Sequence, residues 1–208
     1  IIAEGAQGAL LDIDHGTYPF VTSSNPTSGG ACTGLGIPPT SISNVIGIVK
    51  AYTTRVGNGP FPTELNDETG ERLRQIGAEF GATTGRPRRC GWLDLVALRY
   101  SVMVNGITEI AITKLDVLDD FDEIKVCTSY TYEGRTLKSF PVDIHTLENL
   151  KCEYTTLKGW KTSLKGIRHW TELPAEVLKY FELIEKFTGA EIKIASLSPD
   201  RTDTLIKL

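Results

Sequence analysis

The pattern of apolar and polar positions predicts short buried strands that alternate with helices carrying one apolar face. Glu109-Ile110-Ala111-Ile112 is an apolar run typical of a buried parallel strand. Ile192 to Ala195 predicts a final buried strand, and Ile42 to Tyr52 predicts a short helical turn followed by another buried strand. The first residues, Ile1-Ile2-Ala3, predict a strand that runs directly into a glycine turn.

The segments between these strands carry the signals of helices and of one hairpin. Helices are predicted at about Asp67–Glu79, Trp92–Asn105 and Pro174–Gly189. Glu123 to Tyr132 and Gly134 to Pro141 predict a hairpin, and the polar residues 145–170 predict a surface excursion. Strands alternating with helices in this way predict an α/β fold with a mostly parallel β-sheet and helices on both faces.

Three of the predicted strands end in polar loops, after Ile2, after Ile112 and after Ala195. The carboxyl ends of parallel strands meet at one edge of a sheet, where open α/β sheets bind their ligands. The sequence therefore predicts a nucleotide-binding crevice at this edge.

Bulk composition narrows the class of protein. The 208 residues suit one large domain or two small ones, and the net charge of −4 disfavours a broad nucleic-acid-binding face. No apolar run approaches the roughly 20 residues of a membrane-spanning helix. The four cysteines are scattered without a Cys-x-x-Cys pair, which indicates reduced thiols of a cytoplasmic protein. Because the chain begins without Met and inside a predicted strand, we expect a fragment.

The segment Gly81 to Cys90 is the strongest candidate for ligand binding. It holds three arginines within four positions, Arg86, Arg88 and Arg89. Gly85 allows a close backbone approach, and Pro87 keeps the loop from becoming helical. Arginine suits two-pronged contact with carboxylate or phosphate, so the loop is expected to hold a small anion. A solvated basic turn is the alternative for an isolated run of this kind.

Two further segments follow predicted strands or turns. Thr113-Lys114-Leu115-Asp116 comes directly after a strand and has the form with which GTPases recognise guanine, because the carboxylate accepts from the ring N–H and the exocyclic amine together. Asp12, Asp14 and His15 suggest either a metal site or a turn fixed by local hydrogen bonds, and we favour the turn.

Six segments, in this order, give essentially the whole chain a close resemblance to the adenylosuccinate synthetases. They are Glu4–Gly8, Leu11–Pro19, Val21–Asn25, Gly59–Glu64, Glu79–Arg86 and Thr113–Asp116. The resemblance implies a P-loop-NTPase-like α/β fold that is truncated here, with residues 1–208 forming the C-terminal part of a single synthetase domain. It also implies a GTP- and Mg²⁺-dependent ligase of AMP biosynthesis that joins IMP and L-aspartate through a 6-phosphoryl-IMP intermediate. Such enzymes are cytoplasmic homodimers in which the neighbouring subunit completes each IMP site.

The resemblance also assigns roles to individual residues. IMP contacts fall on Gln7, Thr22, Val56 and Arg86. The aspartate loop comprises Ala82, Thr83, Thr84, Gly85, Arg86, Pro87 and Arg88. GTP contacts fall on Arg88, Lys114, Leu115, Asp116, Ser196, Leu197 and Ser198. Pro87 stands where the family often has arginine and Ser198 where glycine is common, which weakens the contact expected of Ser198.

The resemblance places the family's phosphate loop, its catalytic aspartate, which is also a Mg²⁺ ligand, and its catalytic histidine upstream of residue 1. No catalytic residue and no metal ligand is therefore assigned within this chain, and the chain alone is expected to lack activity. Two alternatives are a non-catalytic nucleotide-binding module and a nucleic-acid-binding domain that uses the arginine loop. The acidic balance and the lack of aromatics near that loop argue against the second.

Overall fold

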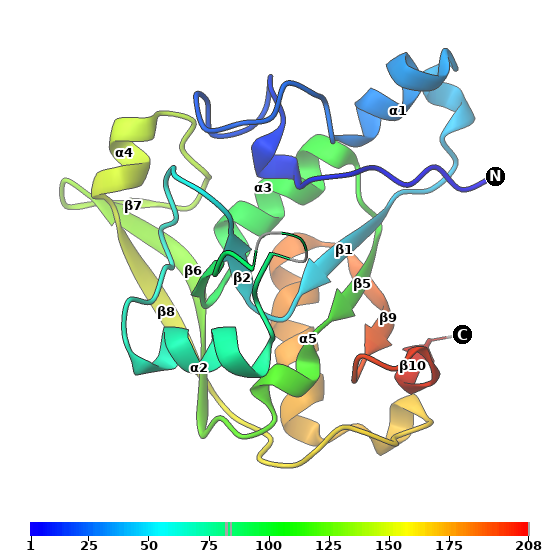
Figure 1. Ribbon diagram of the computed structural model, residues 1–208, viewed down its shortest axis with the longest axis vertical. Helices are drawn as coiled ribbons and strands as arrows, with labels where there is room; N and C mark the ends of the chain where they lie inside the picture. The colour runs from blue at the N-terminus through cyan, green and yellow to red at the C-terminus, as the bar shows by residue number, and fades with distance from the viewer. Residues whose placement is uncertain (82, 84, 208) are drawn as a thin grey trace.

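The computed structural model describes residues 1–81, 83 and 85–207. Its main sheet has the strand order β1-β5-β9-β10 (Figure 1). The strands are β1 (Ile46–Lys50), β5 (Glu109–Thr113), β9 (Glu191–Ser196) and β10 (Thr204–Ile206). Strands β1, β5 and β9 pair in parallel, and β10 adds to β9 in the antiparallel direction. The predicted α/β class with a mostly parallel main sheet is confirmed.

Two smaller sheets flank the main one. A second sheet is built around the long strand β6, and a two-stranded ribbon joins β2 to β3. The strands are β2 (Thr53–Arg55), β3 (Arg89–Gly91), β4 (Leu93–Asp94), β6 (Glu123–Tyr132), β7 (Arg135–Leu137) and β8 (Lys151–Lys158). The predicted hairpin is confirmed in β6 and β7, although β7 ends at Leu137.

Three of the described helices begin at an aspartate whose side chain accepts from an amide of the first turn. The helices are α1 (Ser28–Leu35), α2 (Glu68–Ile76), α3 (Leu95–Asn105), α4 (Ile144–Asn149) and α5 (Ala175–Thr188). Short 3₁₀ turns occur at η1 (Ala9–Leu11), η2 (Pro39–Ser41), η3 (Leu115–Leu118), η4 (Trp170–Glu172) and η5 (Arg201–Asp203). The Asp67 side chain caps α2 as predicted, and Gly106 and Gly189 end α3 and α5 in the left-handed conformation. Within the described part of the chain, no helix combines the length and apolar character needed to cross a membrane.

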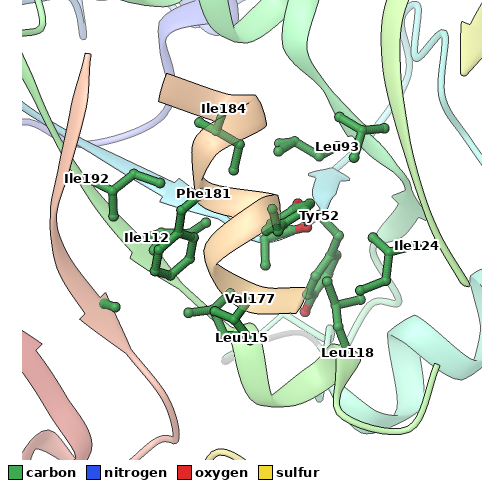
Figure 2. Packing of buried hydrophobic residues seen from close by; sticks show 14 of the residues in the cluster. Tyr52, Leu93, Ile112, Leu115, Leu118, Ile124, Val177, Phe181, Ile184 and Ile192 are labelled. Carbon is green, nitrogen blue, oxygen red and sulfur yellow. Dashed lines mark hydrogen bonds between the residues drawn. The ribbon is translucent and has the colours of Figure 1, made fainter. Parts of the chain in front are cut away.

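One core cluster joins α5 to one face of the main sheet and extends on the other side of α5 to Leu93, Leu118 and Ile124 (Figure 2). Figure 2 shows Val177, Phe181 and Ile184 of α5 packed close to Ile112 and Ile192 of the sheet. These side chains are fully or almost fully buried, so their removal from water supplies much of the folding free energy. This packing fixes the strands that carry the candidate site.

The opposite face of the main sheet carries exposed apolar side chains. Ile48, Ala111, Ile194 and Ile206 are aligned across the four strands. Ile48 and Ile206, on the two edge strands, are 72% and 64% exposed, whereas Ala111 is 9% exposed. The prediction that the strand within Ile42 to Tyr52 is buried is therefore wrong for this face. Its periodicity identified a strand, but burial also requires a second layer on that side of the sheet.

Two other predictions from the sequence are wrong wholly or in part. Ile1 and Ile2 are fully exposed and form no strand, because an apolar run becomes a strand only where a neighbouring strand accepts its hydrogen bonds. Residues 145–170 lie mostly at the surface as predicted, but they are not an excursion outside the fold, since they contain most of α4 and all of β8, which pairs along β6. Cross-strand pairing with β6 was not visible in the polar composition of this segment.

Gly91 provides a test of how tightly β3 is held. A Cβ at this position would lie 2.1 Å from the backbone oxygen of Thr63, whereas a Cβ at Gly34 in α1 would meet nothing within 4 Å. We expect Gly91→Ala to lower the free energy of unfolding by about 1–3 kcal/mol, as overpacking typically does. Gly34→Ala should leave it unchanged or raise it, because alanine favours helix. Urea unfolding of both variants decides this, and equal midpoints would contradict the close contact of β3 with Thr63.

Candidate functional site

The parallel strands bring the three segments that follow them to the same edge of the main sheet. The carboxyl ends of β1, β5 and β9 lie side by side, and they are followed by β2, by η3 and by residues 197–203 (Figure 1). Two of the three loops predicted to form a crevice, those after Ile112 and Ala195, are therefore adjacent. The third, after Ile2, does not follow a strand.

The segment that resembles a guanine-binding motif has a distinct backbone. Lys114 has a positive φ of 64°, and its Nζ donates to the carbonyl oxygen of Gly77 at 2.8 Å. The side chain of Leu115 is buried in the core, so only its backbone is available to a ligand. Asp116 is half-buried, and burial raises the pKa of its carboxyl while the charge of Lys114 counteracts the rise.

The arginine loop is closed by backbone hydrogen bonds at its base. The amide of Gly81 donates to the carbonyl of Arg86 at 2.8 Å, and Phe80 forms a β-bridge with Pro87. Thr83, Gly85, Arg86 and Pro87 are exposed, and Gly85 has a positive φ of 64° as its glycine character predicts. The predicted contacts at Ala82 and Thr84 lie outside the described residues.

The β2–β3 ribbon places a predicted IMP contact beside this loop. Arg55 is paired with Arg89 in the antiparallel ribbon. Val56 follows Arg55 directly, and Arg88 precedes Arg89, so Val56 and Arg88 lie at the same end of the ribbon. Val56 is 57% exposed, which leaves its backbone open to solvent and to a ligand.

Glu79 lies at the base of the arginine loop and belongs to the Glu79–Arg86 segment, but no role was predicted for it from the sequence. It is 1% exposed, and its carboxylate accepts from Lys50 Nζ at 2.8 Å, Tyr52 Oη at 2.7 Å and Arg88 Nη1 at 2.6 Å. Burial raises the pKa of Glu79, but these hydrogen bonds and charges outweigh burial and lower it. Lys50 and Tyr52 precede Glu79 by 29 and 27 residues, and Arg88 follows it by 9 residues. No local motif therefore predicts this cluster.

The three arginines of the loop have different surroundings. Arg89 is held away from the loop tip by Glu64, with Nε to Oε1 at 2.7 Å and Nη2 to Oε2 at 2.5 Å. Its Nη1 also donates to the carbonyl of Gly59 at 2.8 Å. These contacts make Arg89 a structural residue, and they leave Arg86 and Arg88 as the candidates for anion binding.

The segment after Gln7 is organised by the buried carboxylate of Asp12. Its Oδ1 accepts from the amides of Asp14 and His15 at 2.9 and 3.0 Å, and its Oδ2 accepts from Thr27 Oγ1 at 2.9 Å. Burial opposes ionisation, but these hydrogen bonds outweigh it and lower the pKa of Asp12. The prediction of a turn fixed by local hydrogen bonds is confirmed. Among the residues that the structure describes, no group of three or more His, Cys, Asp and Glu side chains is arranged to hold a metal ion.

The remaining IMP candidates lie near this turn. Arg55 Nη2 donates to Thr17 Oγ1 at 3.1 Å and to the carbonyl of Phe20 at 3.0 Å, which ties the segment containing Thr22 to the end of β2. Thr22 is half-buried, and its Oγ1 accepts from Ser24 at 3.3 Å. Gln7 is exposed, and its backbone has a φ of +73°. A positive φ is uncommon for residues other than glycine, and such backbone strain is often found at functional sites.

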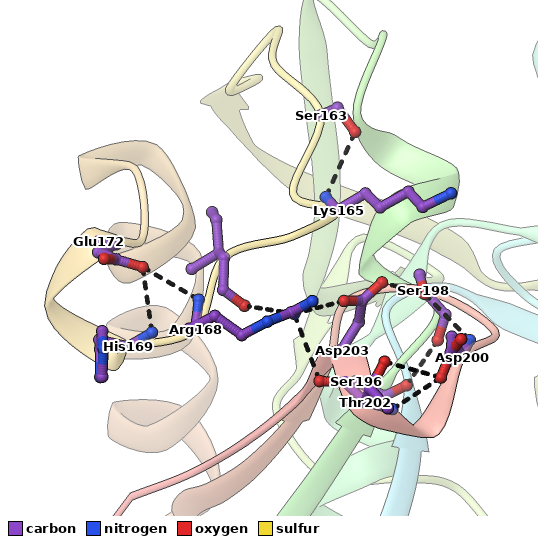
Figure 3. Close-up of polar contacts among 11 residues, drawn as sticks. Ser163, Lys165, Arg168, His169, Glu172, Ser196, Ser198, Asp200, Thr202 and Asp203 are labelled. Atoms are coloured by element: carbon purple, nitrogen blue, oxygen red, sulfur yellow. Dashed lines mark hydrogen bonds and ion pairs between the residues drawn. The ribbon is translucent and has the colours of Figure 1, made fainter.

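The loop after β9 is stabilised by a third buried carboxylate, that of Asp203 (Figure 3). Ser198 Oγ donates to Asp203 Oδ2 at 2.7 Å, and Arg168 Nη1 donates to Oδ1 at 2.5 Å. The hydroxyl of Ser196 donates to the Ser198 carbonyl at 3.1 Å, and the Leu197 side chain is buried in the core. Ser198 thus turns its hydroxyl toward Asp203, and the arrangement leaves backbone groups as the means of contacting a ligand.

Two cavities of the described structure lie elsewhere. One of about 340 Å³ is lined by Gly59 to Pro62, Arg89 and Leu147, and one of about 260 Å³ lies beside α2 at Leu65 to Asp67. Neither is lined by the predicted site residues. The described chain thus brings the predicted loops of β5 and β9 to one sheet edge without enclosing them in either cavity.

Comparison with known proteins identifies the family. The model of the adenylosuccinate synthetase family matches residues 1–205. The adenylosuccinate synthetase of Chlorobium chlorochromatii is 60% identical over 207 residues, which are 100% of this chain and 48% of that protein. That of Salinibacter ruber is 56% identical over 205 residues, which are 99% of this chain and 47% of that protein. The chain spans about half the length of the curated relatives it matches.

A solved structure agrees with the sequence relatives. Fully ligated adenylosuccinate synthetase from Plasmodium falciparum aligns with a TM-score of 0.95 at 44% identity, covering 99% of this chain and 49% of that chain. The backbone described above is thus close to that of the corresponding half of a synthetase. With a family match over nearly its whole length, the chain belongs to the adenylosuccinate synthetase family.

Proposed function

We propose that residues 1–208 form the C-terminal part of an adenylosuccinate synthetase that joins IMP and L-aspartate at the expense of GTP. The reaction proceeds through 6-phosphoryl-IMP, whose phosphate is displaced by the amino group of aspartate. The observation that carries this proposal is that the Lys114–Asp116 segment follows β5 and contacts, through Lys114 Nζ and the Gly77 carbonyl, the turn that leads into the arginine loop. It is supported by the family match over residues 1–205.

GTP binding is proposed for the loops that follow β5 and β9. The carboxylate of Asp116 accepts from the guanine ring N–H and amine, and the stem of Lys114 covers the ring. The Lys114 ammonium is already directed to the Gly77 carbonyl, which favours a fixed orientation of the segment. Backbone groups of Leu115 and of Ser196 to Ser198 complete the contacts, since the leucine side chains at 115 and 197 are buried.

IMP and aspartate binding is proposed for the arginine loop and for the segments that contain Gln7, Thr22 and Val56. Gln7, Thr22 and the backbone of Val56 contact IMP, and the loop from Ala82 to Arg88 receives aspartate. Arg86 bridges the aspartate carboxylate and the IMP ribose, and Arg88 lies between aspartate and the GTP phosphates. Such guanidinium contacts neutralise charge that develops during phosphoryl transfer and hold the reactants in place.

Mg²⁺ is implied by the family, but the described residues do not fit it. Among them no group of three or more His, Cys, Asp and Glu side chains is arranged to hold a metal ion, and the Asp12 carboxylate is engaged by hydrogen bonds from the protein. The Mg²⁺ ligands, together with the catalytic aspartate and histidine, are proposed to lie in the part of the synthetase that this chain does not span.

The exposed face of the main sheet supports the proposal that more of the synthetase packs there. Parallel sheets are usually covered on both faces, and Ile48 and Ile206, on the two edge strands of this face, are open to solvent here. We also propose that the synthetase is a cytoplasmic homodimer, because the resemblance to the family implies it.

A full-length chimera tests the proposed activity. This chain replaces the matching 48% of the Chlorobium chlorochromatii synthetase, and adenylosuccinate formation is measured with GTP, IMP and aspartate. We expect turnover by the chimera and none by the isolated 208 residues, because the catalytic pair is proposed to lie in the other half. An inactive but folded and dimeric chimera would contradict the proposed function. Turnover by the isolated chain would contradict the assignment of catalysis to the other half.

Guanine recognition by Asp116 is tested by comparing GTP with ITP, which lacks the exocyclic amine. In the chimera, Asp116→Ala should raise the KM for GTP about 100-fold, because hydrogen bonds to a charged group contribute roughly 1.5–3 kcal/mol each. The advantage of GTP over ITP should shrink at the same time. Asp120→Ala removes a nearby exposed carboxylate and serves as the matched control. An undiminished preference for GTP in Asp116→Ala would remove Asp116 from the site.

A further inference from the structure

We propose that Glu79 is a positioning residue of the synthetase, which holds Arg88 at the base of the arginine loop and ties that loop to the guanine-binding segment. The proposal rests on the proposed function, because Arg88 is assigned there to aspartate and the GTP phosphates. It gives a role to Glu79, the first residue of the Glu79–Arg86 segment, to which the resemblance assigns none.

Glu79 holds Arg88 through both its backbone and its side chain. The amide of Arg88 donates to the Glu79 carbonyl at 2.9 Å, and Arg88 Nη1 donates to Glu79 Oε2 at 2.6 Å. A guanidinium has five N–H donors, so a contact at one nitrogen directs the group without exhausting its capacity for an anion. The Arg88 side chain is 31% exposed, so it is oriented by the protein and still accessible from solvent.

The second carboxylate oxygen connects Glu79 to the main sheet. Glu79 Oε1 accepts from Lys50 at the end of β1 and from the hydroxyl of Tyr52, and Lys50 Nζ also donates to Thr54 Oγ1 at 2.9 Å. Because the carboxylate bridges Arg88 on one side and the end of β1 on the other, it sets the distance between the arginine loop and the sheet edge.

The turn that carries Glu79 also contacts the guanine-binding segment. Lys114 Nζ donates to the carbonyl of Gly77, two residues before Glu79. Gly77 fits tightly at this place, since a Cβ there would lie 2.2 Å from the Tyr52 hydroxyl. Residues 77–79 therefore contact the aspartate loop through Arg88 and the GTP loop through Lys114, and a single short turn fixes both.

The charges around Glu79 explain why a carboxylate is needed there. Lys50 and Arg88 contact it directly, and Lys114 and Asp116 lie close enough to influence Lys50 and Tyr52 electrostatically. Without the carboxylate, three cations would converge on one place and repel one another. Glu79 lets Arg88 be placed beside Lys50, and the positive charge that remains favours the anionic groups of aspartate and GTP.

Kinetics of Glu79→Gln in the full-length chimera test this role. The amide keeps the shape of the side chain and removes its charge, so Arg88 should lose its fixed orientation. We expect kcat/KM for aspartate to fall between about 10- and 100-fold, as small misplacements of positioning groups do. The KM for IMP should change less than twofold. Glu176→Gln removes the acid of the ion pair between Glu176 of α5 and Lys158 of β8 and should leave all constants unchanged.

A double-mutant comparison separates positioning from a general structural role. In an Arg88→Met background, Glu79→Gln should cost less than twofold in kcat/KM for aspartate, because its target is already absent. An equal loss in both backgrounds, or an equal rise in KM for all three substrates, would overturn the proposal. If Glu79→Gln is insoluble, Glu79→Asp is measured in the same way, and insolubility of both would show that the carboxylate serves folding alone. An inactive unsubstituted chimera would instead refute the proposed function.

Discussion

Buried carboxylates that are fully engaged by hydrogen-bond donors fix the loops on which this site depends. Asp12, Glu79 and Asp203 are all nearly inaccessible to solvent, and a buried charge is tolerated only where donors replace the water it has lost. Asp12 meets amides and a threonine hydroxyl, Glu79 meets two cations and a tyrosine, and Asp203 meets an arginine and a serine. Each carboxylate organises a different loop, and each of these loops carries or adjoins residues assigned to a ligand.

The main sheet determines where these loops are held. Parallel pairing of β1, β5 and β9 aligns their carboxyl ends, and α5 packs against one face so that the alignment is rigid. Glu79 and Asp203 then hold the loops relative to that edge, Glu79 through Lys50 at the end of β1 and Asp203 through Ser198 after β9. Since hydrogen bonds to a buried charge are geometrically demanding, a small set of contacts specifies the positions of segments far apart in the chain.

Local sequence signals predicted the elements and the loops but not the contacts that place them. Strand β5, the Asp67 cap and the glycine ends of α3 and α5 follow from periodicity and capping, which depend on neighbours in the chain. The role of Glu79 depends on Lys50 and Tyr52, 29 and 27 residues away, and that of Asp203 depends on Arg168, 35 residues away. Strand β8 was missed for the same reason, because its half-polar residues become a strand only through pairing with β6.

The two errors about burial have a common physical cause. Ile1 and Ile2 have the composition of a strand, and Ile46 and Ile48 lie in one, yet all four side chains are exposed. Apolar composition indicates that a segment can be buried. Whether it is buried depends on which other segments pack against it, and only the structure shows that. Strand β1 is at the edge of its sheet, and relatives are about twice as long as this chain. The errors therefore support the proposal that further synthetase structure covers this side, and the sheet edge that gathers the ligand loops would then become one wall of a closed site.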